Sequence, residues 1–255
     1  MARLFDDAQS EYLKAASIGV SSLPYSMAAW IYPDDVSIGG YILSIGDSSN
    51  EQNYAGIAFS GNLAGDPVTA LSRDSATLPS YAQSTAGAGG VANTWYHAAG
   101  VFAALNSRAA YFNGGSKGTN STTRIPTGLD STFVSSAARS TPATFFSGRV
   151  AEVGLWNAAL TDAEVASLAA GLCPLLVRPD ALVGYWPLGG VYDADSGDHD
   201  VAGAAPLTAY NTPSTADHPG GILYPASIGL FPAAGAAATV RPWYYHQRNR
   251  LRRAM

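Results

Sequence analysis

Carboxylate side chains decide whether this chain could hydrolyse a glycan, because retaining hydrolysis needs two carboxyl groups about 5 Å apart. The glutamates are few and widely spaced: Glu11, Glu51, Glu152 and Glu164. Glu152 lies in a predicted strand, and no acidic residue follows it two or four positions later, where a side chain would share its face. The sequence therefore offers no paired carboxylates, and a glucan hydrolase is only a remote alternative.

Aspartates are dense at one point of the chain, at Asp193, Asp195, Asp198 and Asp200. Calcium takes carboxylate and carbonyl oxygens on loops, so this segment is the predicted calcium site, with Asp193, Asp195 and Asp198 as ligands. Asp47 with Asn50 is a second possibility. The spacing is similar to the start of an EF-hand loop, but Gly203 stands where that loop needs a bidentate Glu. A solvated acidic turn is the simpler interpretation, and no other cofactor is predicted.

The last fifteen residues combine arginines with aromatic side chains at the end of an acidic chain. Five arginines and no acid in 241–255 leave nine basic against 19 acidic residues in 1–240, a net charge of −10. Arginine and tyrosine are common anchors of protein interfaces, whereas an acidic body repels the phosphates of nucleic acid. We therefore predict a tail that docks on a partner protein rather than on nucleic acid. Its residues are Trp243, Tyr244, Tyr245, Arg248, Arg250, Arg252 and Arg253.

Two further groups of residues could suggest a catalytic or metal site, but the sequence around them does not support it. Gly114, Ser116 and Gly118 fit the nucleophile pattern G-x-S-x-G, which requires a sharp turn from a strand into a helix. These residues instead follow Asn113 in an Asn-Gly pair that is typical of a hairpin turn. The four histidines lack the spacing of a zinc site, and His97 is expected to be packed and hydrogen-bonded within a strand.

Sugar binding would need an exposed aromatic surface with polar neighbours. The tryptophans of the predicted strands are expected in the core: Trp30, Trp95, Trp156 and Trp186. Tyr54 and Tyr81, near predicted loop edges, are looser candidates. The sequence does not select among them, so the glycan-binding residues stay unknown at this point.

The segment 145–188 carries the clearest elements that would position such groups. Two-residue alternation over 149–156 predicts a strand with Val150 and Glu152 on the same face. Thr161 stands three residues before Glu164, a capping box that predicts a helix start. Gly171 is expected to end this helix. A single short helix among strands indicates a β-sandwich on whose surface the helix packs as a clip.

Short strands with turn residues between them fill most of the remaining chain. We predict a first hairpin arm in 3–17, with Leu4, Phe5, Tyr12 and Leu13 as core residues. Further strands are expected within 25–35, 41–47, 54–61, 67–74, 94–104, 107–115 and 182–188. This spacing predicts an all-β, antiparallel sandwich of the jelly-roll type.

Composition agrees with a folded sheet protein that carries an extension. Of 255 residues, 47% are hydrophobic and 13% charged, and Cys173 is alone, so no internal disulfide forms. The sequence contains neither an apolar signal core nor a membrane-spanning run, which predicts a product made in the cytoplasm with no membrane partner. We place the sandwich in 1–211 and an extended, Pro/Ala-rich arm in 212–255.

The order of several segments resembles laminin-G-like, concanavalin A-like domains. They are FDDAQSEYLKA, SMAAWIYPDD, NTWYHAAGVF, RAAYFNGGSKGT and FSGRVAEVGLWNAALTDAEVASLAAG, which span about 3–172, with LVGYWPL similar to a further strand. The resemblance implies a jelly roll of two sheets, often with calcium at its rim. Glucanases of this fold carry Glu-x-Asp-x-x-Glu on one strand, and this chain has no such pattern. The combination with VRPDALVGYWPL is similar to proteins of tailed bacteriophages and prophages.

These observations predict a non-enzymatic virion structural protein, such as a capsid decoration, neck, tail accessory or fibre protein. It would be made in the host cytoplasm, form a homo-oligomer, and attach to other virion proteins through its C-terminal arm. The alternative is a carbohydrate-binding adhesion module that recognises host surface glycans.

Overall fold

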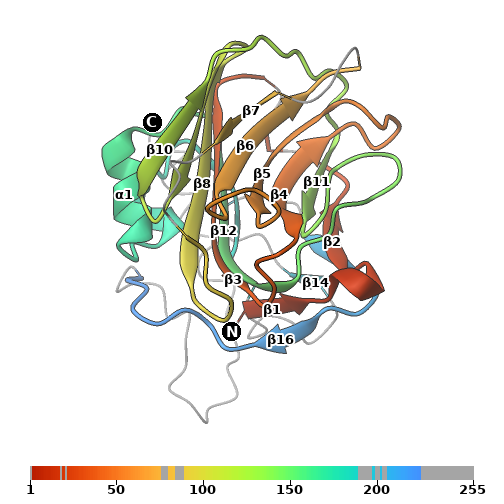
Figure 1. Cartoon of the computed structure of the whole chain (residues 1–255). Coiled ribbons are helices and arrows are strands. Elements are labelled where there is room, and N and C mark those ends of the chain that lie inside the picture. The colour runs from red at the N-terminus through yellow and green to blue at the C-terminus, as the bar shows by residue number, and fades with distance from the viewer. Residues whose placement is uncertain are drawn as a thin grey trace, which may run out of the picture.

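The computed structural model describes residues 2–17, 19–20, 22–75, 80–83, 89–188, 197–198, 202 and 206–224. Within these residues the chain forms two antiparallel sheets that pack face to face, with one short α-helix outside them (Figure 1). The predicted all-β sandwich with one short helix is confirmed. The predicted C-terminal arm is described only as far as Tyr224, so its docking tail lies outside the described residues.

One layer, sheet A, contains the strands on which the helix packs. Its order is β10 (Gly115–Asn120), β9 (Ser107–Phe112), β8 (Tyr96–Ala104), β3 (Tyr25–Pro33), β12 (Gly148–Trp156), β1 (Ala2–Phe5) and β16 (Ser214–Ala216), and β13 (Leu182–Trp186) also pairs with β12. Strands β1 and β13 pair with different halves of β12. Strand β16 pairs with β1, so the described start of the predicted arm adds a strand to the sandwich.

The other layer, sheet B, brings together strands from both ends of the described chain. Its order is β14 (Gly197–Asp198), β15 (Leu207–Tyr210), β2 (Tyr12–Ala15), β11 (Ser131–Val134), β4 (Gly39–Gly46), β5 (Tyr54–Ser60), β6 (Val68–Arg73) and β7 (Ser80–Gln83). Strands β10 and β11 were not predicted. Exposed β10 has no large apolar side chain, and β11 has only four residues, so pairing with neighbours defines both.

The core between the sheets is formed by side chains that alternate inward along each strand. Phe5, Met27 and Phe102 of sheet A meet residues such as Leu13 and Ile57 of sheet B, and all are buried. Each such side chain contributes about 1.5–3 kcal/mol on burial, which supports folding without a disulfide. Trp156 and Trp186 are buried as predicted. The prediction that Leu4, Tyr12, Trp30 and Trp95 belong to the core is wrong, since each is only half-buried. Leu13 and Ala15 point inward, so alternation turns half-buried Tyr12 to the outer face of sheet B.

A β-bulge interrupts the alternation predicted for β12. The register against β3 shifts between Ala151 and Gly154, and Glu152 has a φ of +53°. Val150, Val153 and Leu155 join the inner core, whereas Glu152 bonds residues that cover the outer face. The predicted pairing of Val150 and Glu152 on one face is therefore wrong. The extra residue of the bulge lets Glu152 point outward.

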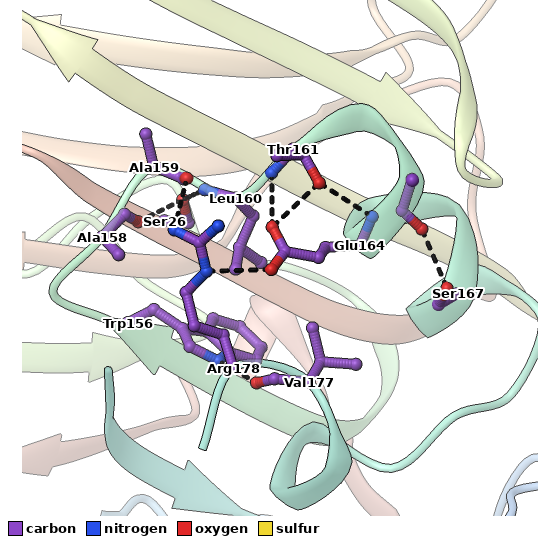
Figure 2. A network of polar contacts seen from close by, with 11 residues as sticks. Ser26, Trp156, Ala158, Ala159, Leu160, Thr161, Glu164, Ser167, Val177 and Arg178 are labelled. Carbon is purple, nitrogen blue, oxygen red and sulfur yellow. Dashed lines mark hydrogen bonds and ion pairs between the residues drawn. The ribbon is translucent and has the colours of Figure 1, made fainter. Parts of the chain in front are cut away.

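The helix forms the predicted clip on the outer face of sheet A. Helix α1 (Asp162–Ala169) begins with the predicted capping box, in which the Glu164 amide donates to Thr161 Oγ1 (3.3 Å) and the Thr161 amide to Glu164 Oε2 (2.7 Å). Figure 2 shows that Arg178, beyond the helix, also bonds Glu164 (2.8 Å). Gly171 follows the helix with a φ of +95°, as predicted. Single 3₁₀ turns are η1 (Asp7–Gln9) and η2 (Pro174–Leu176).

Candidate functional site

A chain segment crosses the outer face of sheet B and covers its middle strands. This strap, residues 135–147, is bonded to the sheet by Ser44 Oγ, which donates to the Ser136 carbonyl (2.6 Å). Gly46 is required beneath the strap, because a Cβ at that position would overlap the Ala138 carbonyl oxygen. Tyr41 and Tyr54 form a buried cluster with Ala137 of the strap. Tyr54 was a candidate sugar-binding residue because it lay near a predicted loop edge, but it is only 5% exposed, so that expectation is wrong.

Beside the strap, two tyrosines stack on the part of sheet B that remains accessible. The rings of Tyr12 and Tyr210 lie 4.6 Å apart between centroids and 2° from parallel. They are direct partners across strands β2 and β15, and the next pair on the same face is Lys14 and Thr208. We call these four residues the tyrosine platform. Tyr210 is 40% exposed, and Thr208 is exposed as well.

The surroundings of the platform fix its rings and leave one side open. Phe133 stacks on Tyr12 at 5.6 Å, and Phe145 of the strap lies 6.0 Å from Tyr12. These contacts cover Tyr12 on the side away from Tyr210. On the other side Gly197 of β14 pairs with Thr208, and a glycine adds no side chain to this face. The platform is therefore an aromatic surface with one supported side and one exposed ring.

The polar groups of the platform suit recognition of a hydroxylated ligand. Burial and the neighbouring Tyr210 raise the pKa of the Tyr12 phenol, so it keeps its proton at neutral pH. The Lys14 ammonium lies 5.1 Å from the Phe133 ring centroid, a cation–π contact that holds it beside the tyrosines. Phenol and threonine hydroxyls both donate and accept hydrogen bonds, and the ammonium donates.

Sequence reasoning missed this platform. Its two tyrosines are 198 positions apart, and they meet only because β15 pairs with β2. A local signal was present for Tyr12, since Leu13 and Ala15 alternate with Tyr12 and Lys14 as apolar and polar faces do. Tyr81, the other loosely predicted aromatic, is described only in its backbone as part of β7.

The outer face of sheet A buries a second polar cluster. The Glu152 carboxylate is 2% exposed and accepts from Tyr185 Oη (2.6 Å) and Tyr224 Oη (2.8 Å). His218 Nε2 lies 2.9 Å from the same carboxylate, and its Nδ1 lies 2.9 Å from the Pro219 carbonyl. Both ring nitrogens lie at hydrogen-bond distance from an oxygen, so the imidazole links the carboxylate to the following turn. The cluster thus ties residues 218–224 to the sheet.

Beside this cluster, His97 is buried and neutral. It is 2% exposed, packs edge-on against Trp30, and burial lowers its pKa to about 3. Its Nδ1 has no hydrogen-bond partner among the described residues. The hollow that His97 and Glu152 line with Leu168 and Ile222 has no room for a water molecule. The predicted packing of His97 is confirmed, whereas the predicted hydrogen bonding is not found at Nδ1.

The other glutamates are also engaged by neighbouring groups. Glu11 accepts from the Asp6 amide (2.8 Å), Glu51 from the Thr141 amide (2.7 Å), and Glu164 belongs to the helix cap. Bonds from Ser140 and Thr141 lower the pKa of the Glu51 carboxyl. Each glutamate therefore holds a turn, the strap, a helix end or the sheet A cover.

Most of the predicted calcium site lies outside the described residues. Asp193 and Asp195 lie outside the described residues, and Asp198 is described only as backbone in β14. In the rest of the described chain, no three His, Cys, Asp or Glu side chains gather as a metal site would require. Calcium binding stays a prediction.

The G-x-S-x-G letters fall at the β9–β10 turn, where Gly114 has a φ of +73°.

The family model of the concanavalin A-like lectin/glucanases superfamily, Laminin_G_3, matches residues 7–166, more than half of the chain. The chain belongs to this superfamily. The match runs from η1 into α1 and includes the strap and Tyr12 of the platform, whereas Tyr210 lies beyond it. The predicted resemblance to this superfamily is confirmed, and the link to bacteriophages stays a prediction.

Two solved structures of low sequence identity share the fold of this superfamily member. One is an inferred carbohydrate-binding protein from Bacteroides ovatus, with 16% identity and a TM-score of 0.56 over 86% of this chain and 60% of that one. The other is the CBM40 of the Ruminococcus gnavus IT-sialidase bound to α2,3-sialyllactose, with 16% identity and a TM-score of 0.50 over 61% of this chain and 91% of that one. A comparison with curated proteins finds no match. None of the described helices is long and apolar enough to span a membrane.

Proposed function

We propose that the protein is a non-catalytic, lectin-like carbohydrate-binding module whose tyrosine platform holds the sugar. The observation that carries the proposal is the exposed ring of Tyr210, stacked on Tyr12 at the open side of sheet B. A sugar ring has apolar C–H faces and a rim of hydroxyls. The Tyr210 ring offers an apolar surface to such a face, and Thr208 and Lys14 offer hydrogen-bond partners to the rim.

The position of the platform favours binding over turnover. Phe133 and Phe145 hold the Tyr12 ring, and the Tyr210 ring stacks on Tyr12, so less side-chain freedom is lost when a ligand binds. None of its four residues is a carboxylate, and hydrolysis would need two carboxylates about 5 Å apart. Each described glutamate holds a structural contact instead. The site therefore has what a lectin needs and lacks the acid and nucleophile of a hydrolase.

The names of the two similar structures support a carbohydrate as the ligand class. At 16% identity they share the fold with this chain, and the proposal takes no particular sugar from them. The finer prediction, recognition of host surface glycans, follows from the sequence-based link to bacteriophages. It remains part of the proposal.

A glycan array probed with the purified full-length chain tests the proposal. We expect saturable binding to at least one glycan class, and about a tenfold loss of affinity in Tyr210→Ala, since a lost aromatic contact is worth about 0.5–1.5 kcal/mol. Tyr210→Phe keeps the ring and should retain most of the affinity. Absence of binding across the array, or equal binding by Tyr210→Ala, would overturn the proposal.

The predicted virion structural role depends on the docking tail, which lies outside the described residues. The arginines and aromatic residues of 241–255 support it, and so does the acidic charge of the remaining chain. Truncation after Ala238 should leave a folded chain that still binds glycan but no longer joins its assembly. Co-purification with virion particles measures this, and normal assembly of the truncated chain would remove the anchoring role.

A further inference from the structure

Part of the outer face of sheet A carries aromatic side chains that the cover leaves half-buried. Trp30 and Tyr32 alternate outward along β3, since Ile31 between them joins the inner core. Trp95 stands just before β8, the strand beside β3 (Figure 1), and its ring lies 5.4 Å from the Tyr32 ring between centroids. We call Trp30, Tyr32, Trp95 and the neighbouring Arg149 the aromatic patch; all four are half-buried.

Arg149 shows how this patch holds a guanidinium. It pairs with Tyr32 across β12 and β3, and its guanidinium lies 4.5 Å from the centroid of the Tyr32 ring. The Asp217 carboxylate, whose side chain is 96% exposed, lies 3.7 Å from Arg149 Nη1. A ring face and a carboxylate therefore hold this arginine together, by a cation–π contact and an ion pair.

The rim of the patch offers the same combination to further arginines. Asp34 and Asp35 come two and three positions after Tyr32, and both are exposed. Bonds from the Ser37 hydroxyl and amide lower the pKa of the Asp35 carboxyl, so it is charged at neutral pH. The patch also contains two indole rings, and tryptophan is the best cation–π partner. A ligand that matches this surface carries arginines and aromatic rings.

The docking tail of this chain has that composition. Residues 241–255 hold five arginines, three aromatic residues and no acid. The described chain reaches Tyr224 beside the patch, since Ile222 and Trp30 line the same hollow. Residues 225–240 separate Tyr224 from the tail, and an extended chain of that length spans at most about 50 Å. The tail is therefore long enough to reach the patch of its own chain.

We infer that the aromatic patch is the docking site of residues 241–255 of the same chain. Tail guanidinium groups lie on the tryptophan rings and pair with the aspartates of the rim, in the arrangement that Arg149 already has. The link between tail and patch gives an effective concentration in the millimolar range, which favours the chain's own tail over that of a second copy. A partner protein then obtains the tail only in competition with the patch. The inference is independent of the proposed function, because the patch and the tyrosine platform share no residue.

Paramagnetic broadening of NMR signals in the ¹⁵N-labelled full-length chain tests the inference. A nitroxide on Met255→Cys marks the end of the tail, and Cys173 is buried and inaccessible to the label. We expect broadened amide signals at Tyr32 and Trp95 and much weaker broadening at Thr208 on the other sheet. The broadening should disappear at about 1 M salt, where the screening length falls to about 3 Å.

Matched variants of the labelled chain show whether the patch itself holds the tail. Asp35→Asn keeps an acceptor for Ser37 but removes the charge, and should lower the docking constant about twofold or more. Asp180→Asn removes the same charge from another exposed position and should leave docking unchanged. Trp95→Ala should lower the docking constant about threefold or more, because a cation–π contact is lost. Tyr210→Ala, its control on sheet B, should leave docking unchanged.

A mixed sample identifies which copy supplies the tail. Nitroxide-labelled chains without ¹⁵N are added to ¹⁵N-labelled chains without nitroxide, and we expect no broadening at the patch. Broadening there would assign the patch to the tail of a second copy and overturn docking within one chain. Absence of broadening at the patch in the labelled chain, or broadening that Asp35→Asn and Trp95→Ala both leave intact, would overturn the patch as the docking site. Since Tyr210→Ala should reduce glycan affinity without affecting docking, failure of this inference and failure of the proposed function are distinguishable.

Discussion

The outer faces of the two sheets are both covered, but by different chemistry and to a different extent. On sheet A, α1 and residues 172–177 and 222–224 cover the strands, and Glu152 bonds the cover from beneath. On sheet B, the strap covers the middle strands and leaves the tyrosine platform open at one side. Sheet A is not fully closed, since Trp30 and Tyr32 on its outer face are only half-buried. Its cover contributes stability, and we expect the exposed Tyr210 ring of sheet B to meet the ligand.

The largest expected effect comes from removing the carboxylate that holds the cover of sheet A. Glu152→Ala should cost about 3–5 kcal/mol of unfolding free energy, because two phenols and an imidazole lose their buried acceptor. Glu152→Gln keeps an acceptor oxygen and should cost less. Urea denaturation of both variants measures this, and a loss under about 1 kcal/mol in Glu152→Ala would contradict a structural role for the cluster.

Acid should destabilise the same face through His97. Its pKa is about 3 in the folded chain and 6.5 in the reference state, so between these values the unfolded chain binds more protons. The stability present above pH 6.5 is therefore lost as pH falls, by about 2 kcal/mol at pH 5. The measurement is the unfolding free energy at pH 7 and pH 5 for the wild type and His97→Phe, which cannot titrate. Equal pH dependence in the two proteins would show that His97 contributes nothing.

A smaller effect is expected at the helix that clips sheet A. Thr161→Ala removes the capping hydroxyl and should lower the unfolding free energy by about 1 kcal/mol. Ser167→Ala is a control on the same helix, since that hydroxyl only bonds the Ala163 carbonyl one turn earlier, and it should change stability by less than 0.5 kcal/mol. Urea midpoints compare the two. Neither variant should alter glycan affinity. A loss of affinity in Thr161→Ala would contradict a glycan-binding site on sheet B.

The sequence was informative where the signal is local. Apolar alternation predicted most core strands, and Thr161, Glu164 and Gly171 predicted the helix and its ends. Strand β11 depends on pairing with the distant β2 and β4, and β10 pairs with the adjacent β9 but has no large apolar side chain, so no local apolar pattern predicts either strand. The bulge at Glu152 reversed its predicted face, because a single added residue changes the register without changing the apolar composition.

The tyrosine platform depends even more on contacts between distant residues, because it requires β15 to return beside β2. Superfamily membership predicted the sandwich in which these contacts arise. It did not predict that the strap would bury Tyr54 and leave Tyr210 exposed.

The central claim is that the open side of sheet B, and not the covered face of sheet A, binds carbohydrate. The most direct test is an NMR titration of the ¹⁵N-labelled full-length chain with a glycan that the array identifies. We predict saturating amide shifts at Lys14, Thr208 and Tyr210, and unchanged amides at Glu152 and Val165. Shifts that cluster at Glu152 and α1 while the platform residues stay unchanged would contradict the account.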